Sequence, residues 1–228
     1  MRANINLIHG DCMEGLRGMG DDAFELALVD PPYGIGADAK NNGKTSDCHE
    51  RTSLARLNTY KRTNWDNGIP TQEYFAELRR VSQRQVVWGA NHFGMTGGML
   101  FWDKEVTMPT YSRGELAWLS WLKRVDYYRY QWHGMLQGNM KDKEQRIHPT
   151  QKPVALYKWL LSNYAKEGDR ILDTHLGSAS IAIACWDMGF DLIGYELDPD
   201  YYAAAVARVE KHKAQGQFEF NDQNGGNQ

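Results

Sequence analysis

The last third of the chain alternates between strand-like and helix-like segments, and this alternation limits the folds available to the whole protein. Residues 170–173 form a short strand-like run, small residues follow at 174–178, and the spacing then predicts a helix over 179–188. A second strand at 191–196 leads into a long helix that begins at Pro199, because proline fits the first turn of a helix. A strand, loop, helix, strand and helix in this order make a unit of a parallel sheet. The chain is therefore expected to be an α/β protein.

The earlier part of the chain continues this pattern and is interrupted twice. Further strands are expected at residues 5–8, 24–29, 85–88, 99–102 and 116–121, and further helices at 13–19, from Thr71 onward and at 153–165. Two charged stretches, 37–67 and 123–147, are interpreted as insertions, and residues 127–147 are expected to be irregular. Residues 1–228 are expected to form one domain with a disordered tail at 221–228, which is rich in Gly, Asn and Gln.

The cysteines and the apolar runs indicate the cellular compartment. Cys12, Cys48 and Cys185 are widely spaced and form no CxxC pair, so neither a disulfide framework nor a zinc site is expected. No apolar run approaches the roughly 20 residues of a membrane helix, and the N-terminus lacks the apolar stretch of a signal peptide. We therefore expect a cytoplasmic protein with no membrane and no metal.

Charge is distributed unevenly along the chain. The net charge of −3 argues against a generally basic nucleic-acid binder. However, six basic residues outnumber two acidic ones between Lys40 and Thr63, and seven outnumber three between Lys123 and Lys152. Residues 187–222 carry eight acidic and three basic side chains. This polarity predicts that the two basic stretches contact phosphates, with two solvated loops as the alternative.

The tetrapeptide Asp30-Pro31-Pro32-Tyr33 follows the strand expected at 24–29. It brings a carboxylate, two rigid prolines and an aromatic ring to one strand end, and each proline holds φ near −65°. The carboxylate and a proline carbonyl accept hydrogen bonds, and the ring offers a stacking surface. Such a set is suited to gripping the exocyclic NH2 group of a nucleobase. An ordinary strand followed by a turn is the alternative.

The loop at 174–178 predicts a small-molecule site. Gly177 is its single glycine, and Glu196 ends the next strand, 23 residues after Asp173, where a carboxylate accepts hydrogen bonds from ribose hydroxyls. The loop does not read GxGxxG, and the carboxylate of Asp173 would repel the pyrophosphate of a dinucleotide. The same carboxylate would attract an ammonium group, so S-adenosylmethionine fits better than NAD. An ordinary strand-turn-helix connection is the alternative.

Four motifs in order resemble those of amino-methyltransferases that act on adenine or cytosine in DNA. Residues 30–33 match the catalytic motif of this family, and residues 173–180 resemble its cofactor loop, Asp-Pro-Phe-x-Gly-Ser-Gly. Residues 148–153 match the segment before that loop in one subgroup, and residues 9–12 resemble the N-terminal turn that touches the cofactor's adenine. The resemblance spans roughly residues 5 to 212, and the catalytic motif comes first, as in the β-type arrangement.

The resemblance implies a fold and a set of site residues. The fold is that of a class I methyltransferase with permuted motif order: a Rossmann-like, mixed but mostly parallel sheet with helices on both faces. The catalytic residues are Asp30, Pro31, Pro32 and Tyr33. The residues that bind S-adenosylmethionine are Asp11, Cys12, Asp30, Thr150, Lys152, Asp173, His175, Gly177, Ser178, Glu196 and Leu197.

Three residues of the cofactor loop depart from the family's motif. Thr174 and His175 replace the usual Pro and Phe, and Ala179 replaces the second Gly. An alanine is compatible with this position if its φ angle is negative. His175 is interpreted as a hydrogen-bonded structural histidine beside the cofactor.

The resemblance also names a substrate, with Tyr33 stacking on a flipped-out base. Asp rather than Ser before Pro-Pro-Tyr favours N6-adenine by resemblance, and N4-cytosine is the closest alternative. An RNA or protein amide substrate, or a catalytically silent protein that binds DNA or S-adenosylmethionine, are the others. Duplex DNA is expected to contact Lys40, Lys44, Arg51, Arg56, Lys61, Arg62, Arg129, Lys141, Lys143 and Arg146.

The length of the chain bears on its assembly. A methyltransferase of 228 residues has little room for a separate target-recognition domain, and the β-type relatives are often dimers. We therefore expect a homodimer in a cytoplasmic, prokaryotic or phage-like DNA-modification system. The aromatic clusters at 101–102 and 118–121 are candidates for the interface or for the core.

Overall fold

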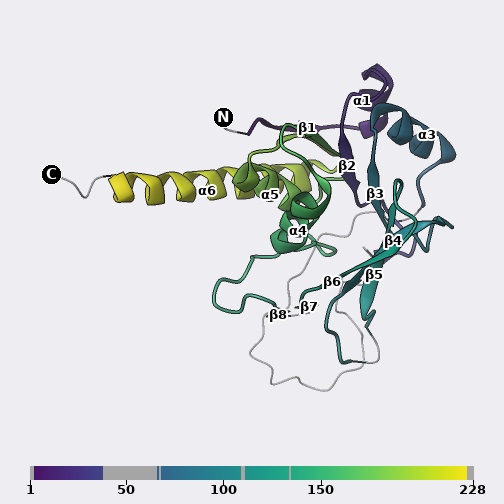
Figure 1. Ribbon diagram of the computed structural model, residues 1–228. Helices are drawn as coiled ribbons and strands as arrows, with labels where there is room; N and C mark the ends of the chain where they lie inside the picture. The colour runs from purple at the N-terminus through teal and green to yellow at the C-terminus, as the bar shows by residue number, and fades with distance from the viewer. Residues whose placement is uncertain (1–2, 38–65, 67, 109–110, 134, 225–228) are drawn as a thin grey trace.

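The computed structural model describes residues 3–37, 66, 68–108, 111–133 and 135–224, with side chains up to residue 215 (Figure 1). Within these residues, eight strands form one sheet: β1 Ile5–His9, β2 Leu26–Val29, β3 Gln85–Trp88, β4 Gly98–Asp103, β5 Gly114–Leu119, β6 Val125–Arg129, β9 Arg170–Asp173 and β10 Asp191–Glu196. A separate hairpin pairs β7 Trp132–His133 with β8 Leu136–Gln137. The helices are α1 Cys12–Gly18, α3 Gln72–Val81, α4 Val154–Tyr164, α5 Ser180–Met188 and α6 Pro199–Asn224.

The sheet is mixed but mostly parallel. Its strand order is β1-β10-β9-β2-β3-β5-β4-β6, and the first five of these strands pair in parallel. The direction then reverses, because β5 is antiparallel to both β3 and β4, and β6 pairs in parallel with β4. This arrangement confirms the mixed, mostly parallel sheet expected from the sequence.

Helices cover both faces of the sheet, so the core has two halves. The central strands β2 and β3 are buried along their whole length, which is why their sequences are almost continuously apolar. Leu28 of β2 packs in the cluster that includes residues of α4, α5 and α6, whereas the next residue, Val29, packs in the cluster that includes residues of α1 and α3. Figure 1 shows the two groups of helices on opposite sides of the sheet. The expected three-layer architecture is thereby confirmed.

The connections before α1, α3 and α5 differ in how they begin a helix. Asp11 caps α1 by accepting a hydrogen bond from the Met13 N–H at 2.9 Å, and Thr71 caps α3 through the Tyr74 N–H at 3.2 Å. Ala179 precedes α5 with φ at +57°, so the negative angle that would make an alanine compatible with this position is not adopted. A left-handed alanine costs about 1–2 kcal/mol. Complete burial of the Ala179 methyl group offsets part of that cost.

The expectation that residues 127–147 are irregular is wrong for β6, β7 and β8. In β6 the side chains of Val125, Tyr127 and Arg129 are exposed, and those between them are half-buried. The strand lies at the edge of the sheet, where charged residues are common, so its alternation carried little apolar signal. Several boundaries also differ by one or two residues, and β5 ends at Leu119 instead of residue 121. The helix α6 extends to Asn224, four residues into the segment expected to be disordered.

Most of the first expected insertion, residues 38–65 and 67, lies outside the described residues, as do residues 225–228. In the described part of the chain, no helix is both long enough and apolar enough to cross a membrane.

Candidate active site

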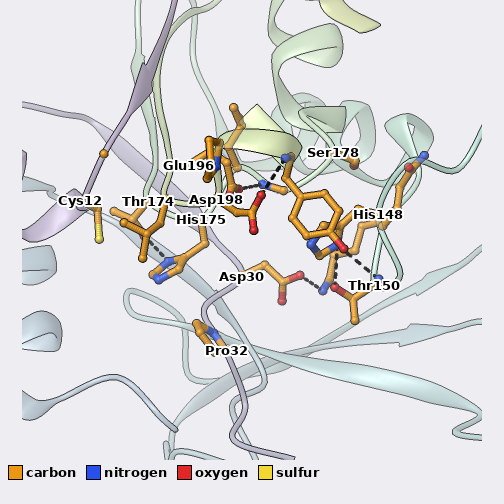
Figure 2. A pocket seen from close by; sticks show the side chains of 18 of the residues that line it. Cys12, Asp30, Pro32, His148, Thr150, Thr174, His175, Ser178, Glu196 and Asp198 are labelled. Carbon is orange, nitrogen blue, oxygen red and sulfur yellow. Dashed lines mark hydrogen bonds and ion pairs between the residues drawn. The ribbon is translucent and has the colours of Figure 1, made fainter. Parts of the chain in front are cut away.

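The parallel strands bring four distant segments to one edge of the sheet. Asp11 follows β1, Asp30 follows β2, Thr174 follows β9 and Leu197 follows β10, and all four line one cavity of about 480 Å³. Figure 2 shows Asp30 in this cavity, with Glu196 and Asp198 above it in the view. The whole lining is Gly10, Asp11, Cys12, Asp30, Pro32, His148, Thr150, Gln151, Lys152, Tyr157, Thr174, His175, Leu176, Gly177, Ser178, Glu196, Leu197, Asp198, Pro199 and Tyr201.

The structure brings together nearly all of the residues expected to bind the cofactor. Of these, Asp11, Cys12, Asp30, Thr150, Lys152, His175, Gly177, Ser178, Glu196 and Leu197 line the cavity. Pro32 of the expected catalytic motif also lines it. Asp173 is different: it ends β9 with only 1% of its surface exposed, and the wall itself is formed by the residues that follow it.

Glu196 fixes the glycine loop to the end of β10. Its Oε2 accepts a hydrogen bond from the Gly177 N–H at 2.7 Å, and its Oε1 accepts one from the Asp198 N–H at 3.0 Å. Gly177 has a φ of +53°, in the left-handed region that favours glycine. Burial raises the pKa of Glu196, and the backbone N–H groups oppose that shift. Each carboxylate oxygen keeps a lone pair that can accept a further hydrogen bond from a ligand.

His175 is hydrogen-bonded and also lines the cavity. Its Nδ1 lies 2.9 Å from the Thr174 Oγ1, which in turn lies 2.7 Å from the Tyr74 hydroxyl oxygen. The ring meets Tyr74 edge to face at 5.4 Å between centroids. Burial lowers the pKa of His175 to about 4, so the ring is neutral at pH 7. Figure 2 shows the ring between Cys12 and Asp30.

The segment at 148–153 supplies the opposite wall. The His148 Nδ1 lies 3.2 Å from the Thr150 Oγ1, and the His148 ring meets Tyr201 of α6 edge to face at 4.3 Å. Burial lowers the pKa of His148 to about 4, and Lys152 adds to that effect. This wall is therefore uncharged at His148 and carries its positive charge at Lys152.

Asp30 and Tyr33, which the sequence predicts to be catalytic, are in direct contact. The Tyr33 hydroxyl donates a hydrogen bond to Asp30 Oδ1 at 2.6 Å, and Lys152 forms an ion pair with Oδ2. The Tyr33 ring stacks on His92 at 5.0 Å between centroids and lies directly against Gly89. Burial raises the pKa of Asp30, and the Lys152 ammonium opposes that shift. The carboxylate is thus held by two partners at the edge of the cavity.

Two groups of residues were missed by sequence reasoning. Glu115 of β5 pairs with Lys152, and Lys104 pairs with Glu115. Asp66 accepts hydrogen bonds from the backbone N–H groups of Gly34 and Ala37, and so fixes the turn after Tyr33. Neither Glu115 nor Asp66 has a short-range motif, because both meet their partners only in the folded chain.

The expected DNA-binding residues are only partly described. Lys40, Lys44, Arg51, Arg56, Lys61 and Arg62 lie outside the described residues. Lys141 and Lys143 are exposed, and Arg129 is exposed but pairs with Glu105 at 2.7 Å. The half-buried Arg146 lies over the ring of Trp132 at 4.3 Å, so part of its role is packing. Their contact with DNA stays a prediction.

The aromatic clusters divide between core and surface. Trp102 is fully buried and meets Trp88 edge to face at 6.0 Å, so it belongs to the core and not to an interface. Phe101, Trp118 and Trp121 are half-buried. In the described part of the chain, no cluster of three His, Cys, Asp or Glu residues is placed to hold a metal ion.

Comparison with known proteins gives consistent matches. A family model described as DNA methylase matches residues 87–207, a little over half of the chain. The type II methyltransferase M2.MboI of Moraxella bovis is 22% identical over 248 residues, which cover 91% of this chain and 88% of that protein.

Two solved structures share the fold. The M1.HpyAVI–SAM complex has a TM-score of 0.56 and 19% identity, and the match covers 90% of this chain and 99% of that one. The cytosine-N4-specific PvuII DNA methyltransferase also has a TM-score of 0.56, with 13% identity and coverage of 94% and 92%. These likenesses confirm the fold class.

Proposed function

This chain belongs to the N6/N4 DNA methylase family, and from that premise we propose that it transfers a methyl group from S-adenosylmethionine to the N6 amine of adenine in duplex DNA. The observation that carries the proposal is the position of Asp30. Its carboxylate, hydrogen-bonded to Tyr33, stands at the edge of the cavity that the glycine loop closes on the other side.

The cavity suits S-adenosylmethionine in size and in chemistry. A volume of about 480 Å³ lies within the range of small-molecule sites. Glu196 stands at the end of β10, where ribose hydroxyls are bound in related folds, and Leu197 and Pro199 supply apolar surface beside it. When bound, the cofactor supplies an electrophilic methyl group on a sulfonium ion. The ammonium of its amino-acid end is assigned to the vicinity of Asp173.

The residues of this chain would prepare the amine for attack. The amine is a poor nucleophile because its lone pair is delocalised into the base. The Asp30 carboxylate and the Pro31 carbonyl accept its two N–H hydrogens, which favours a pyramidal nitrogen, while Tyr33 stacks on the base. Bound S-adenosylmethionine would supply the methyl group that replaces one amine hydrogen, and that hydrogen would leave as a proton to solvent. Asp30 stabilises the positive charge that develops on nitrogen.

The choice of adenine rests on Asp30 as the first residue of the tetrapeptide. N4-cytosine methylation is the second candidate, because the two amines are chemically alike. The fold also matches a cytosine-N4-specific enzyme with the same TM-score, 0.56, as the M1.HpyAVI–SAM complex. Both candidates use the same residues in the same roles. A protein that binds DNA or S-adenosylmethionine without catalysis would not need the Asp30 carboxylate, the Pro31 carbonyl and the Tyr33 ring arranged around one amine.

One experiment separates these functions. Purified protein is incubated with isotopically labelled S-adenosylmethionine and duplex DNA of mixed sequence, with RNA as a parallel substrate, and the hydrolysed nucleosides are identified by mass spectrometry. We expect N6-methyladenine from DNA, and none from Asp30→Ala protein of unchanged fold. N4-methylcytosine would replace the first candidate by the second. An Asp30→Ala variant that keeps more than about a tenth of the wild-type turnover would contradict the assigned role of Asp30.

A further inference from the structure

Four charged side chains from separate parts of the chain form one alternating series that leads into the site. Lys104 follows β4, Glu115 lies on β5, Lys152 precedes α4 and Asp30 follows β2. Lys104 pairs with Glu115 Oε1, the Lys152 ammonium lies 3.0 Å from Glu115 Oε2, and Lys152 also pairs with Asp30 Oδ2. Lys152 is therefore placed between two carboxylates.

The Lys152 ammonium is enclosed on its other sides. Its side chain is 3% exposed, and the nitrogen lies 5.2 Å from the ring centroid of Trp88 and 5.7 Å from that of Tyr33. It also lies 3.3 Å from the Tyr33 hydroxyl oxygen. A buried cation is costly unless it is paired, so both carboxylates contribute to keeping Lys152 charged at this place.

The net charge of the four side chains is zero, and each inner side chain interacts with two oppositely charged neighbours. Two ammonium groups and two carboxylates alternate, so each inner group has a partner on both sides. Glu115 lies on the side of Lys152 away from Asp30, and its negative charge offsets part of the positive charge of Lys152. Asp30 is therefore not fully neutralised by Lys152. Lys104 limits this attraction by neutralising Glu115 from outside.

We propose that Glu115 is a positioning residue for methyl transfer, which holds Lys152 between two carboxylates so that Asp30 stays ionised without being fully neutralised. The inference rests on the proposed function. Glu115 itself touches neither substrate nor cofactor, and it acts only through Lys152. The balance matters because Asp30 must still attract the positive charge that develops on the target amine.

The series predicts opposite effects for charge removal at Glu115 and at Lys104, the two members farthest from Asp30. Without the charge of Glu115, Asp30 is the only carboxylate paired with Lys152. Asp30 then becomes harder to protonate, and because it is more fully neutralised it is less able to stabilise the positive charge on the amine. Removing the charge of Lys104 strengthens the attraction of Glu115 for Lys152, so Asp30 becomes easier to protonate. A variant that merely loosened the fold would not produce shifts of opposite sign.

Other groups face Asp30 from the elements packed around it. Tyr33 beside it, Tyr74 of α3 and Tyr157 of α4 have pKa values raised well above the ordinary range by burial, so they stay neutral during the test. Burial raises the pKa of Asp173 of β9 to about 8. Asp30 and Lys152 both act on the pKa of Asp173, so the opposite signs expected for Glu115→Gln and Lys104→Gln, and not either profile alone, report on the series.

The test is the pH profile of single-turnover methyl transfer with saturating cofactor and DNA. Glu115→Gln should lower the plateau rate about tenfold and move the acidic limb to lower pH by about one unit. Lys104→Gln should move that limb to higher pH. Glu25→Gln is the matched control, because Glu25 pairs with Arg170 at the opposite end of β2, and it should leave rate and profile unchanged.

A second measurement does not depend on activity. The Lys152 side chain is followed by NMR in lysine-labelled, cofactor-free protein and assigned with Lys152→Arg. Its pKa should fall in Glu115→Gln, because burial lowers the pKa of Lys152 and Asp30 and Glu115 together raise it. An unchanged Lys152 titration would overturn the pairing, whether or not the wild type is active. An inactive wild type would refute the proposed function instead. If the wild type is active, an unchanged rate and profile in Glu115→Gln would overturn the inference. If that variant fails to fold, the absence of an upward shift in Lys104→Gln would do so.

Discussion

Replacing Gly89 with alanine tests whether the Tyr33 ring must lie where the structure has it. A Cβ atom at Gly89 would lie 2.6 Å from Tyr33 Cδ1 and 2.9 Å from Cζ, well inside the roughly 3.4 Å at which ordinary contact begins. The ring cannot stay in place, because the new methyl group is attached directly to the backbone at Gly89, after β3, and cannot rotate away. Displacing the ring breaks the 2.6 Å hydrogen bond from Tyr33 to Asp30.

The magnitude follows from two separate costs. Gly89 has a φ of +78°, so any alanine there costs about 1–2 kcal/mol of stability. The lost hydrogen bond to a charged group is worth about 1.5–3 kcal/mol, which corresponds to a fall in turnover of about 10- to 150-fold. The first cost appears in thermal unfolding, and the second appears in the rate of methyl incorporation.

Gly94 provides the matched control. Its φ of +63° imposes the same kind of backbone cost, but a Cβ atom there would meet nothing within 4 Å. Gly94→Ala should therefore lose stability and keep its turnover, measured well below both unfolding temperatures. If Gly89→Ala matched Gly94→Ala in turnover, the orientation of Tyr33 would not contribute to catalysis and the reasoning would be refuted.

Four further predictions concern the cofactor, the buried acid, DNA and assembly. Glu196→Ala should weaken S-adenosylmethionine binding by about 1–3 kcal/mol in calorimetry, and an unchanged affinity would remove Glu196 from the site. Burial raises the pKa of Asp173 from 3.8 to about 8, so the folded state keeps a proton that the unfolded chain releases. The free energy of unfolding of cofactor-free protein should therefore contain a contribution that falls between about pH 4 and 8 and vanishes in Asp173→Asn; equal pH dependence in both proteins would contradict this. Duplex affinity should fall by about 0.9 log units per phosphate contact per log unit of salt, and alanine at Arg51, Arg56, Lys61 and Arg62 should flatten that slope, whereas an unchanged slope would mean that these side chains are merely solvated. Light scattering should show a homodimer in which one subunit performs the transfer and its neighbour helps to hold DNA; a mass near 26.1 kDa with and without duplex would exclude it.

The positions of most site residues could be predicted from local sequence. Four of the segments at the site directly follow a strand, as Asp30 follows β2 and Thr174 follows β9, and the segment at 148–153 is the exception. The family resemblance predicted that these segments share a site, and the sheet explains why, because parallel strands end at the same edge. The order of the motifs and the family resemblance then indicated the cofactor and the class of reaction.

The local sequence did not determine the electrostatics around Asp30 or the backbone at Ala179. Lys152 reaches Glu115 and Asp30 only after β5 and the segment before α4 pack beside β2, and no spacing rule connects residues 30, 115 and 152. Ala179 adopts a left-handed conformation because buried packing around it outweighs the preference of the isolated residue. Hydrophobic periodicity acts over a few residues and therefore indicated most strands and helices, but not the edge strand β6 or the hairpin of β7 and β8. The pairing of buried charges depends on contacts between distant segments, so only the tertiary structure decided how the carboxylate proposed to be catalytic is held.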